Sequence, residues 1–150
     1  ARKTSGDDTI LLPLAIMTSE DTHELTVALM AEHCNFGLVG SQVFVLKQEK
    51  VPALIDVDAR ISAAGGSIET KPHGHGDVHG VLLKSGLCRR WCDEGRQWLF
   101  VFQDTNPISF RNFTAVLGVS AKNDFVMNSV AIPRFAGETI GGICRLVNEA

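Results

Sequence analysis

Short apolar runs alternate with polar turns and helical patterns along this chain. Residues 10–17 form an apolar run of strand length, and the polar group Thr18-Ser19-Glu20-Asp21 then opens a helical pattern that extends to Met30. A second strand is expected over residues 42–46, followed by an extended segment over residues 51–61. Strands that alternate with helices are typical of an α/β fold.

The second half of the chain continues this alternation after a surface turn at Gly65-Gly66. We expect one helix over residues 78–94, and a strand over residues 98–103 that is apolar on both faces, like the interior of a parallel sheet. A helix is expected over residues 110–119. The last two strands are expected over residues 125–132 and 139–147. The complete pattern predicts a three-layer α/β arrangement.

The turn Lys71-Pro72-His73-Gly74-His75-Gly76-Asp77-Val78-His79 concentrates polar chemistry in nine residues. Gly74 and Gly76 lack a Cβ atom, so the backbone there can take a positive φ and approach a ligand closely. Asp77 can cap the helix that follows. Because a helix N-terminus favours anions, the turn predicts a site for a phosphate or another charged ligand.

Polar side chains follow three of the apolar runs, at the points where the strands end. They occupy residues 18–22, 48–50 and 104–106. The carboxyl ends of parallel strands share one edge of a sheet, so we expect these residues to gather near the glycine turn. The alternative is that they are ordinary loop formers and helix caps.

Composition and charge narrow the classes of partner. The 150 residues carry a net charge of −3 with a pI near 5.9, and 45% of them are hydrophobic. This length suffices for one compact core, and the charge argues against binding of nucleic acid or anionic lipid by bulk electrostatics. The apolar runs are shorter than a membrane span, and no basic-then-apolar leader is seen, so a cytosolic protein without membrane or nucleic-acid partners is expected.

The glycine turn also allows a metal interpretation. His73, His75 and Asp77 nearly reproduce the HxHxDH run with which the metallo-β-lactamase fold binds zinc. The spacing differs by one residue, because Val78 follows the aspartate where that motif has a histidine. No histidine follows His79 to complete a ligand set. We therefore expect no zinc site.

The four cysteines are Cys34, Cys88, Cys92 and Cys144. Cys88 and Cys92 are four residues apart on an expected helix and could share a face, but no CxxC element accompanies them. We expect ordinary buried thiols.

Six blocks of the sequence together resemble one enzyme family. They are the glycine turn at 71–79, PLAIMTS at 13–19, LKQEKV at 46–51, FQDTN at 102–106, LGVSA at 117–121 and IGGI at 140–143. In this order they resemble the UDP-sugar pyrophosphorylases and, more loosely, the UDP-glucose and UDP-N-acetylglucosamine pyrophosphorylases. The resemblance implies a Rossmann-like nucleotidyltransferase fold of the glycosyltransferase-A type, with a mixed, mainly parallel sheet.

The resemblance further implies an activity. Residues 1–150 would be part of the central catalytic domain of a uridylyltransferase, which uses Mg²⁺ and converts UTP and a sugar 1-phosphate into UDP-sugar and pyrophosphate. The family's glycine-rich loop, of the form LxGGxGTRLG, and its C-terminal regions are expected to lie outside these residues. The alternative is a nucleotide-sugar binding or regulatory module without turnover.

Carried over by position, the resemblance assigns the uracil pocket first. Met17 and Thr18 would form its floor, and Gln48 would hydrogen-bond the edge of the base. The backbone of Gly74 would approach the uracil, because a side chain there would occupy the space of the base. His75 would face the α-phosphate and the sugar.

The resemblance assigns the remaining roles to residues further along the chain. Asp104 would be the magnesium ligand and, with His75, a catalytic residue, because hard carboxylate oxygens suit Mg²⁺. Asn106 and Asn128 would bind sugar hydroxyls. The family places the aspartate directly before the asparagine, whereas Thr105 lies between Asp104 and Asn106 here.

Overall fold

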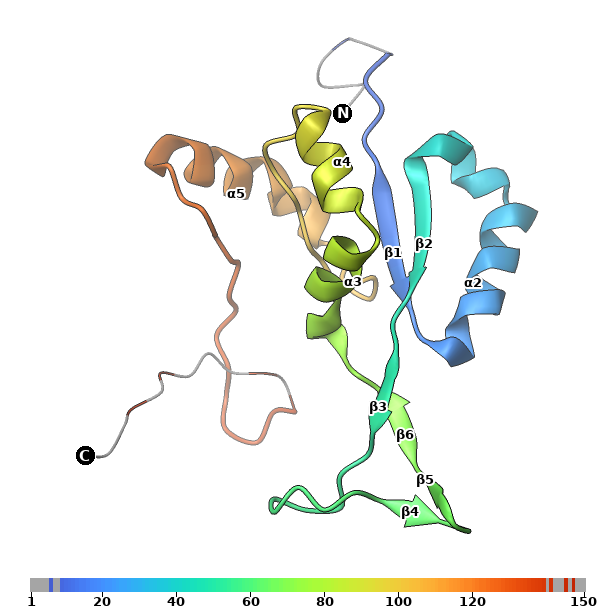
Figure 1. The fold of residues 1–150 in the computed structure, drawn as a ribbon. Helices are drawn as coiled ribbons and strands as arrows, with labels where there is room; N and C mark the ends of the chain where they lie inside the picture. The colour runs from blue at the N-terminus through green and yellow to red at the C-terminus, as the bar shows by residue number, and fades with distance from the viewer. Residues whose placement is uncertain (1–5, 7–8, 140, 142–144, 146, 148–150) are drawn as a thin grey trace. The chain divides into compact units, whose positions relative to one another are not determined.

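The computed structural model describes residue 6, residues 9–139 and residues 141, 145 and 147. The chain divides into two compact units, Ala1–Arg96 and Gln97–Ala150. Each unit is described by itself. The elements of both are drawn in Figure 1.

A parallel pair of strands forms the centre of the first unit. β1 (Leu14–Thr18) pairs with β2 (Val43–Lys47), with Leu14 opposite Val43 and Thr18 opposite Lys47. The helix α2 (Glu20–Glu32) and two short 3-10 turns, η1 (Cys34–Gly37) and η2 (Gly40–Gln42), connect the strands. The strands expected near residues 10–17 and 42–46, and the helix between them, are therefore confirmed.

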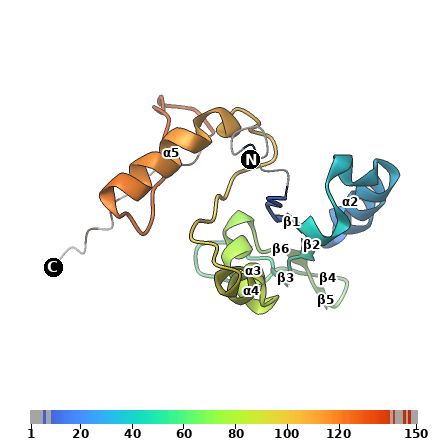
Figure 2. The same cartoon turned by 90° about the horizontal axis from the view of Figure 1, so that it is seen from above.

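Helices lie on both sides of this strand pair. α2 lies on one side, and α3 (Val78–Lys84) and α4 (Leu87–Asp93) lie on the other, as the two views in Figure 1 and Figure 2 agree. The core between the strands and α3–α4 is built from Leu82, Leu87 and Trp91, with partly buried Ala15, Phe44, Leu46, Val78 and Cys88 packed against them. Phe44 meets Trp91 edge to face at 5.9 Å.

The prediction of a single helix over residues 78–94 is wrong, because the segment forms two helices with Gly86 between them. Gly86 has a φ of 76°, a left-handed conformation that favours glycine and ends a helix. In one continuous helix, Leu82 and Leu87 would point in different directions, since they are five residues apart. The break allows both leucines to enter the core, where they are 3% and 6% exposed.

An antiparallel ribbon separates β2 from α3. β3 (Lys50–Pro52) pairs with β6 (Thr70–Pro72), β4 (Ala63–Ala64) pairs with β5 (Ser67–Ile68), and a single bridge joins Leu54 to Ile61. The tip is the expected turn at Gly65-Gly66, whose φ angles are 58° and 80°. The α/β class is confirmed, but the parallel pairing in the described residues is limited to β1 and β2.

The second unit contains α5 (Ser109–Asn123), which confirms the helix expected over residues 110–119. Residues 98–103 are not a strand. Phe100 and Phe102 instead stack on each other and meet the rings of Phe110 and Phe113 on α5. In the described part of this unit no strand is present for the apolar run to pair with.

Two further strands were expected in this unit. Residues 125–132 form no strand, and Val126 and Met127 are 102% and 82% exposed, so the prediction of a strand there is wrong. The strand expected over residues 139–147 falls mostly outside the described residues. Within the described residues, no helix combines the length and the apolar character needed to cross a bilayer.

Candidate functional site

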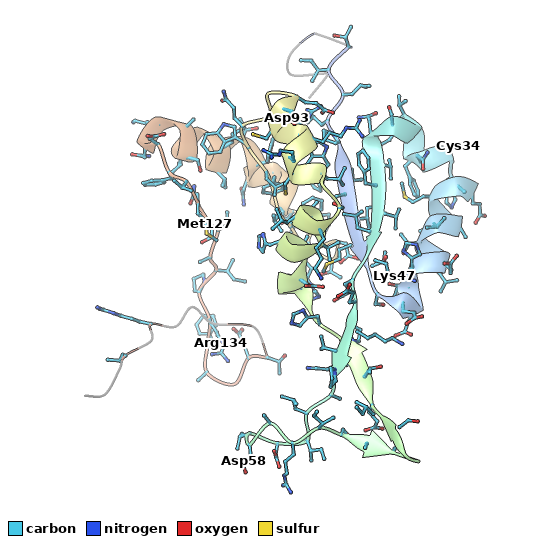
Figure 3. The ribbon with its side chains drawn as sticks, viewed as in Figure 1. Cys34, Lys47, Asp58, Asp93, Met127 and Arg134 are labelled. Carbon is cyan, nitrogen blue, oxygen red and sulfur yellow. The ribbon has the colours of Figure 1, made fainter. Side chains whose placement is uncertain are left out.

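The carboxyl ends of β1 and β2 lie side by side and bring Thr18 next to Gln48. The Gln48 N–H donates to the Thr18 carbonyl over 2.8 Å, one residue beyond the last paired position, Thr18 and Lys47. Lys47, labelled in Figure 3, marks this end of β2. The parallel pair therefore presents Gln48 at the sheet edge.

Gly74 faces Gln48 from the other side of the ribbon. The Gly74 N–H donates to Gln48 Oε1 over 3.0 Å. The register that pairs Lys50 with Pro72 explains this contact, because continuing it by two residues puts Gln48 opposite Gly74. Gly74 has a φ of 123°, as expected for a glycine at this position, and a Cβ atom there would meet nothing within 4 Å. The space in front of the Gly74 backbone is open.

Thr18 forms the buried wall of this site. It is 5% exposed, and its hydroxyl donates to the Leu46 carbonyl over 3.3 Å and lies 2.8 Å from His23 Nδ1. Met17 precedes it on β1, half-buried and opposite Leu46. His23 was not singled out in the sequence analysis. Its position five residues after Thr18, the last residue of β1, is the signal that could have found it.

The glycine turn continues as η3 (His75–Asp77) directly before α3. Of the two glycines at which a positive φ is possible, Gly74 adopts one, and Gly76 lies within η3 without one. Asp77 stands at the N-cap of α3, but its side chain makes no capping hydrogen bond. Its Oδ1 lies 3.1 Å from His73 Nδ1 instead. His75 is exposed.

Two ion pairs flank Gln48. Lys50 Nζ lies 3.1 Å from Glu20 on α2, and Glu49 lies 3.2 Å from Lys84 Nζ on α3. The hydrogen bond from Lys50 holds the pKa of the Glu20 carboxyl below its usual range, and Glu20 raises the pKa of Lys50. All four side chains are solvent-exposed, so these ion pairs contribute little to the stability of the fold.

A cavity of about 250 Å³ opens beside Gln48, between the end of β2 and α3. Its lining residues are Leu46, Lys47, Glu49, Asp77, Val81, Lys84 and Ser85. The lining combines two lysines with two carboxylates beside apolar Leu46 and Val81, so its charge is close to neutral.

The other three site residues expected from the sequence belong to the second unit. Asp104 is exposed, and its Oδ1 accepts the N–H of Thr105 over 2.8 Å. The Asn106 N–H donates to the Gln103 carbonyl over 3.0 Å, and Asn128 Nδ2 donates to the Val116 carbonyl over 3.3 Å. The structure thus brings Thr18, Gln48 and Gly74 together in the first unit. Asp104, Asn106 and Asn128 belong to the second unit, which is described by itself.

Metal-binding side chains do not gather in the described part of the chain. No group of three or more His, Cys, Asp or Glu residues there is arranged to hold an ion. Cys34 and Cys92 are exposed and Cys88 is partly buried, so the expectation of buried thiols is wrong for the first two. Cys144 lies outside the described residues.

Comparison with known proteins decides the family. The family model of UTP–glucose-1-phosphate uridylyltransferase matches residues 2–144. The chain belongs to this family. The match takes in all eight expected site residues, from Met17 to Asn128.

Curated members of the family include close plant relatives. A UDP-sugar pyrophosphorylase of Oryza sativa subsp. indica is 48% identical over 146 residues, which are 95% of this chain and 24% of that protein. A UDP-sugar pyrophosphorylase of Arabidopsis thaliana is 49% identical over 140 residues, covering 91% of this chain and 23% of that protein. The chain therefore spans about a quarter of the length of these relatives.

A solved structure shares the fold. It comes from Entamoeba histolytica and is named as a UDP-N-acetylglucosamine pyrophosphorylase. The TM-score is 0.50 at 23% sequence identity, over 63% of this chain and 24% of that one. This likeness concerns the fold alone.

Proposed function

We propose that this chain forms the base-binding part of a cytosolic uridylyltransferase that makes UDP-sugar and pyrophosphate from UTP and a sugar 1-phosphate. The observation that carries the proposal is the contact of the Gly74 N–H with the Gln48 side chain, beside the ends of β1 and β2. Relatives named UDP-sugar pyrophosphorylases, 48% and 49% identical, support it. Because they are far longer, we expect the active form to be longer too, and call it the full-length protein.

The chemistry of the contact suits a uracil base. A uracil edge offers carbonyl acceptors beside one N–H donor, and a glutamine amide together with a backbone N–H offers the complementary groups. Uracil would take the Gly74 N–H that Gln48 Oε1 now accepts, which frees that oxygen for the base N–H. Met17 and Thr18 would pack under the ring, and the open space at Gly74 leaves room for it.

In the full-length protein, the β1–β2 pair would belong to a larger, mainly parallel sheet of three-layer Rossmann-like form. The carboxyl ends of such strands are where nucleotides bind in α/β sheets. The helices on both sides of the present pair are consistent with this arrangement.

Asp104 is our candidate ligand for Mg²⁺. Magnesium keeps several waters and is held by one or two carboxylates together with phosphate oxygens, so one exposed carboxylate fits. When bound, the ion would neutralise charge on the phosphates. His75 would contact the α-phosphate, and Asn106 and Asn128 would hold sugar hydroxyls. In the reaction, an oxygen of the sugar 1-phosphate attacks the α-phosphorus of UTP, and the bond to pyrophosphate breaks.

The test is UTP binding by calorimetry, with Gln48→Ala compared with Gln97→Ala in the full-length protein. Gln97 is an exposed glutamine of the second unit, so its variant removes the same side chain elsewhere. Loss of the hydrogen bonds to the base should weaken UTP binding by roughly tenfold in Gln48→Ala and leave Gln97→Ala unchanged. Equal affinity in wild type and Gln48→Ala, or no release of pyrophosphate from UTP and any sugar 1-phosphate, contradicts the proposal.

A further inference from the structure

Asp77 is tied to Gly74 in two ways. Its backbone N–H donates to the Gly74 carbonyl over 3.1 Å, and its Oδ1 lies 3.1 Å from Nδ1 of His73, the residue before Gly74. The Asp77 side chain is 18% exposed, against 58% for His73, so the carboxylate forms the inner side of this pair. One residue therefore closes the turn on both sides of Gly74.

The Asp77 side chain does not cap α3, although the residue stands at the N-cap position. An aspartate at an N-cap usually accepts a backbone N–H of the first helical turn, but the Asp77 side chain makes no such bond to α3. Gly80, in the first turn of α3, lies next to this carboxylate, because a Cβ atom there would be in van der Waals contact with Asp77 Oδ1 at 3.4 Å. The carboxylate thus serves the glycine turn instead of the helix.

We propose that Asp77 is a positioning residue for the nucleotide base, acting through His73 and Gly74. The inference rests on the proposed function of the site. The peptide plane between His73 and Gly74 directs the Gly74 N–H at Gln48, and in this turn Gly74 has a φ of 123° and a ψ of 177°. A glycine adopts many other conformations when it is unrestrained. The Asp77–His73 bond fixes the amide before UTP arrives, so that binding has less conformational freedom to remove.

The experiment compares two variants of Asp77, a control, a variant of His73 and a double variant, all in the full-length protein. Asp77→Ala removes the acceptor for the His73 ring, whereas Asp77→Asn keeps an oxygen that can accept its N–H. The control is Asp93→Ala, which removes the same charge at the end of α4, labelled in Figure 3. The readouts are the Kd of UTP by calorimetry, kcat and KM, and hydrogen–deuterium exchange of the peptide that contains Gly74.

Asp77→Ala should raise the Kd and the KM for UTP by roughly threefold to tenfold, the size of one net hydrogen bond. It should leave kcat unchanged and speed exchange at Gly74, while Asp77→Asn restores most of both properties and Asp93→Ala changes neither. His73→Ala removes the same bond from its other end. It should therefore match Asp77→Ala, and the double variant should be no worse than either single one.

Wild-type affinity and wild-type exchange in Asp77→Ala would overturn the proposal, as would additive effects in the double variant. A loss of kcat with unchanged KM would overturn it too, because Asp77 would then act on the reaction itself. If wild type binds no UTP while exchange at Gly74 still responds to Asp77→Ala, the proposed function fails and the hold of Asp77 on Gly74 is supported.

Discussion

The hydroxyl of Thr18 lies 2.8 Å from Nδ1 of His23 and joins the end of β1 to the first turn of α2. The same hydroxyl donates to the Leu46 carbonyl on β2. A hydroxyl has one proton to give, so we infer that the imidazole supplies the proton of the shorter bond. Strand, neighbouring strand and helix thus meet at one buried oxygen.

Thr18→Val should lower the free energy of unfolding by about 1–2 kcal/mol, because it keeps the shape and leaves two partly buried groups without this partner. The control is Thr26→Val on the same helix, whose hydroxyl bonds the Thr22 carbonyl. That exposed bond should matter by less than about 0.5 kcal/mol. Urea unfolding of the 150-residue chain measures both, and equal midpoints in the two variants would contradict the role of Thr18.

Gly74→Ala should affect both folding and binding. An alanine at a φ of 123° is strained by about 1–3 kcal/mol, although its methyl group would meet no atom. The methyl group would also occupy the open space in front of the backbone, so UTP binding to the full-length protein should weaken further. Gly76→Ala is the matched control, since Gly76 is equally open and has no positive φ. Similar losses in both variants would separate Gly74 from the base site.

Two adjacent leucines of α3 should differ sharply in their contribution to the free energy of unfolding. Leu82 is 3% exposed and Leu83 is 72% exposed. Leu82→Ala should cost about 2–5 kcal/mol of unfolding free energy, because it leaves a cavity. Leu83→Ala should change the stability by less than about 0.5 kcal/mol. Unfolding of both variants in urea measures the contrast, and the reverse order would mean that α3 is rotated about its axis.

Glu94 should contribute stability that depends on pH. Hydrogen bonds from Arg90 and then Arg96 hold the pKa of the Glu94 carboxyl below its usual range. A lowered pKa means that the stabilisation is present at neutral pH and is lost as the pH falls through the folded-state pKa. The Tm difference between wild type and Glu94→Gln should therefore shrink from about pH 6 to about pH 3. In an Arg90→Met background the pH dependence should be smaller, and an unchanged one would contradict the pairing.

The metal requirement of the activity distinguishes a magnesium site at Asp104 from a zinc site at the glycine turn, residues 71–79. Asp104→Asn in the full-length protein should abolish Mg²⁺-dependent activity and leave the circular dichroism spectrum unchanged. Asp124→Asn is the control, because Asp124 ends α5 in a left-handed conformation that asparagine also tolerates. Elemental analysis should find no stoichiometric zinc, and one tightly held zinc that His73→Ala removes would favour a hydrolytic metal site instead.

The part of the site formed by Thr18, Gln48 and Gly74 could be predicted from the sequence, because each residue is marked by a local sequence pattern. Apolar runs that end at Met17 and Leu46 predict the ends of two strands, and the carboxyl ends of parallel strands share one edge of a sheet. The glycine at position 74 predicts a backbone that can take a positive φ, and the structure shows a φ of 123° there. The four-residue spacing of His73 and Asp77 also indicated that their side chains could meet. In the sequence analysis the two residues were considered together only as possible metal ligands.

The elements that could not be predicted depend on partners that a local pattern does not name. An apolar run such as residues 98–103 becomes a strand only where another strand can pair with it, and here its phenylalanines pack on α5 instead. The break at Gly86 was missed for a related reason. A glycine inside a helical pattern is often tolerated in a continuous helix. Here the helix is broken, because only then can Leu82 and Leu87 both be buried in the core.

The ribbon between β3 and β6 leaves the site beside Gln48 and returns to it beside Gly74. Its outer end at Gly65-Gly66 is an exposed loop tip, the kind of place where chains tolerate added residues. A fluorescent reporter or an affinity tag attached at this tip would be joined to both walls of the site through paired strands. The protein therefore carries a natural attachment point from which occupancy of the site could be followed by light.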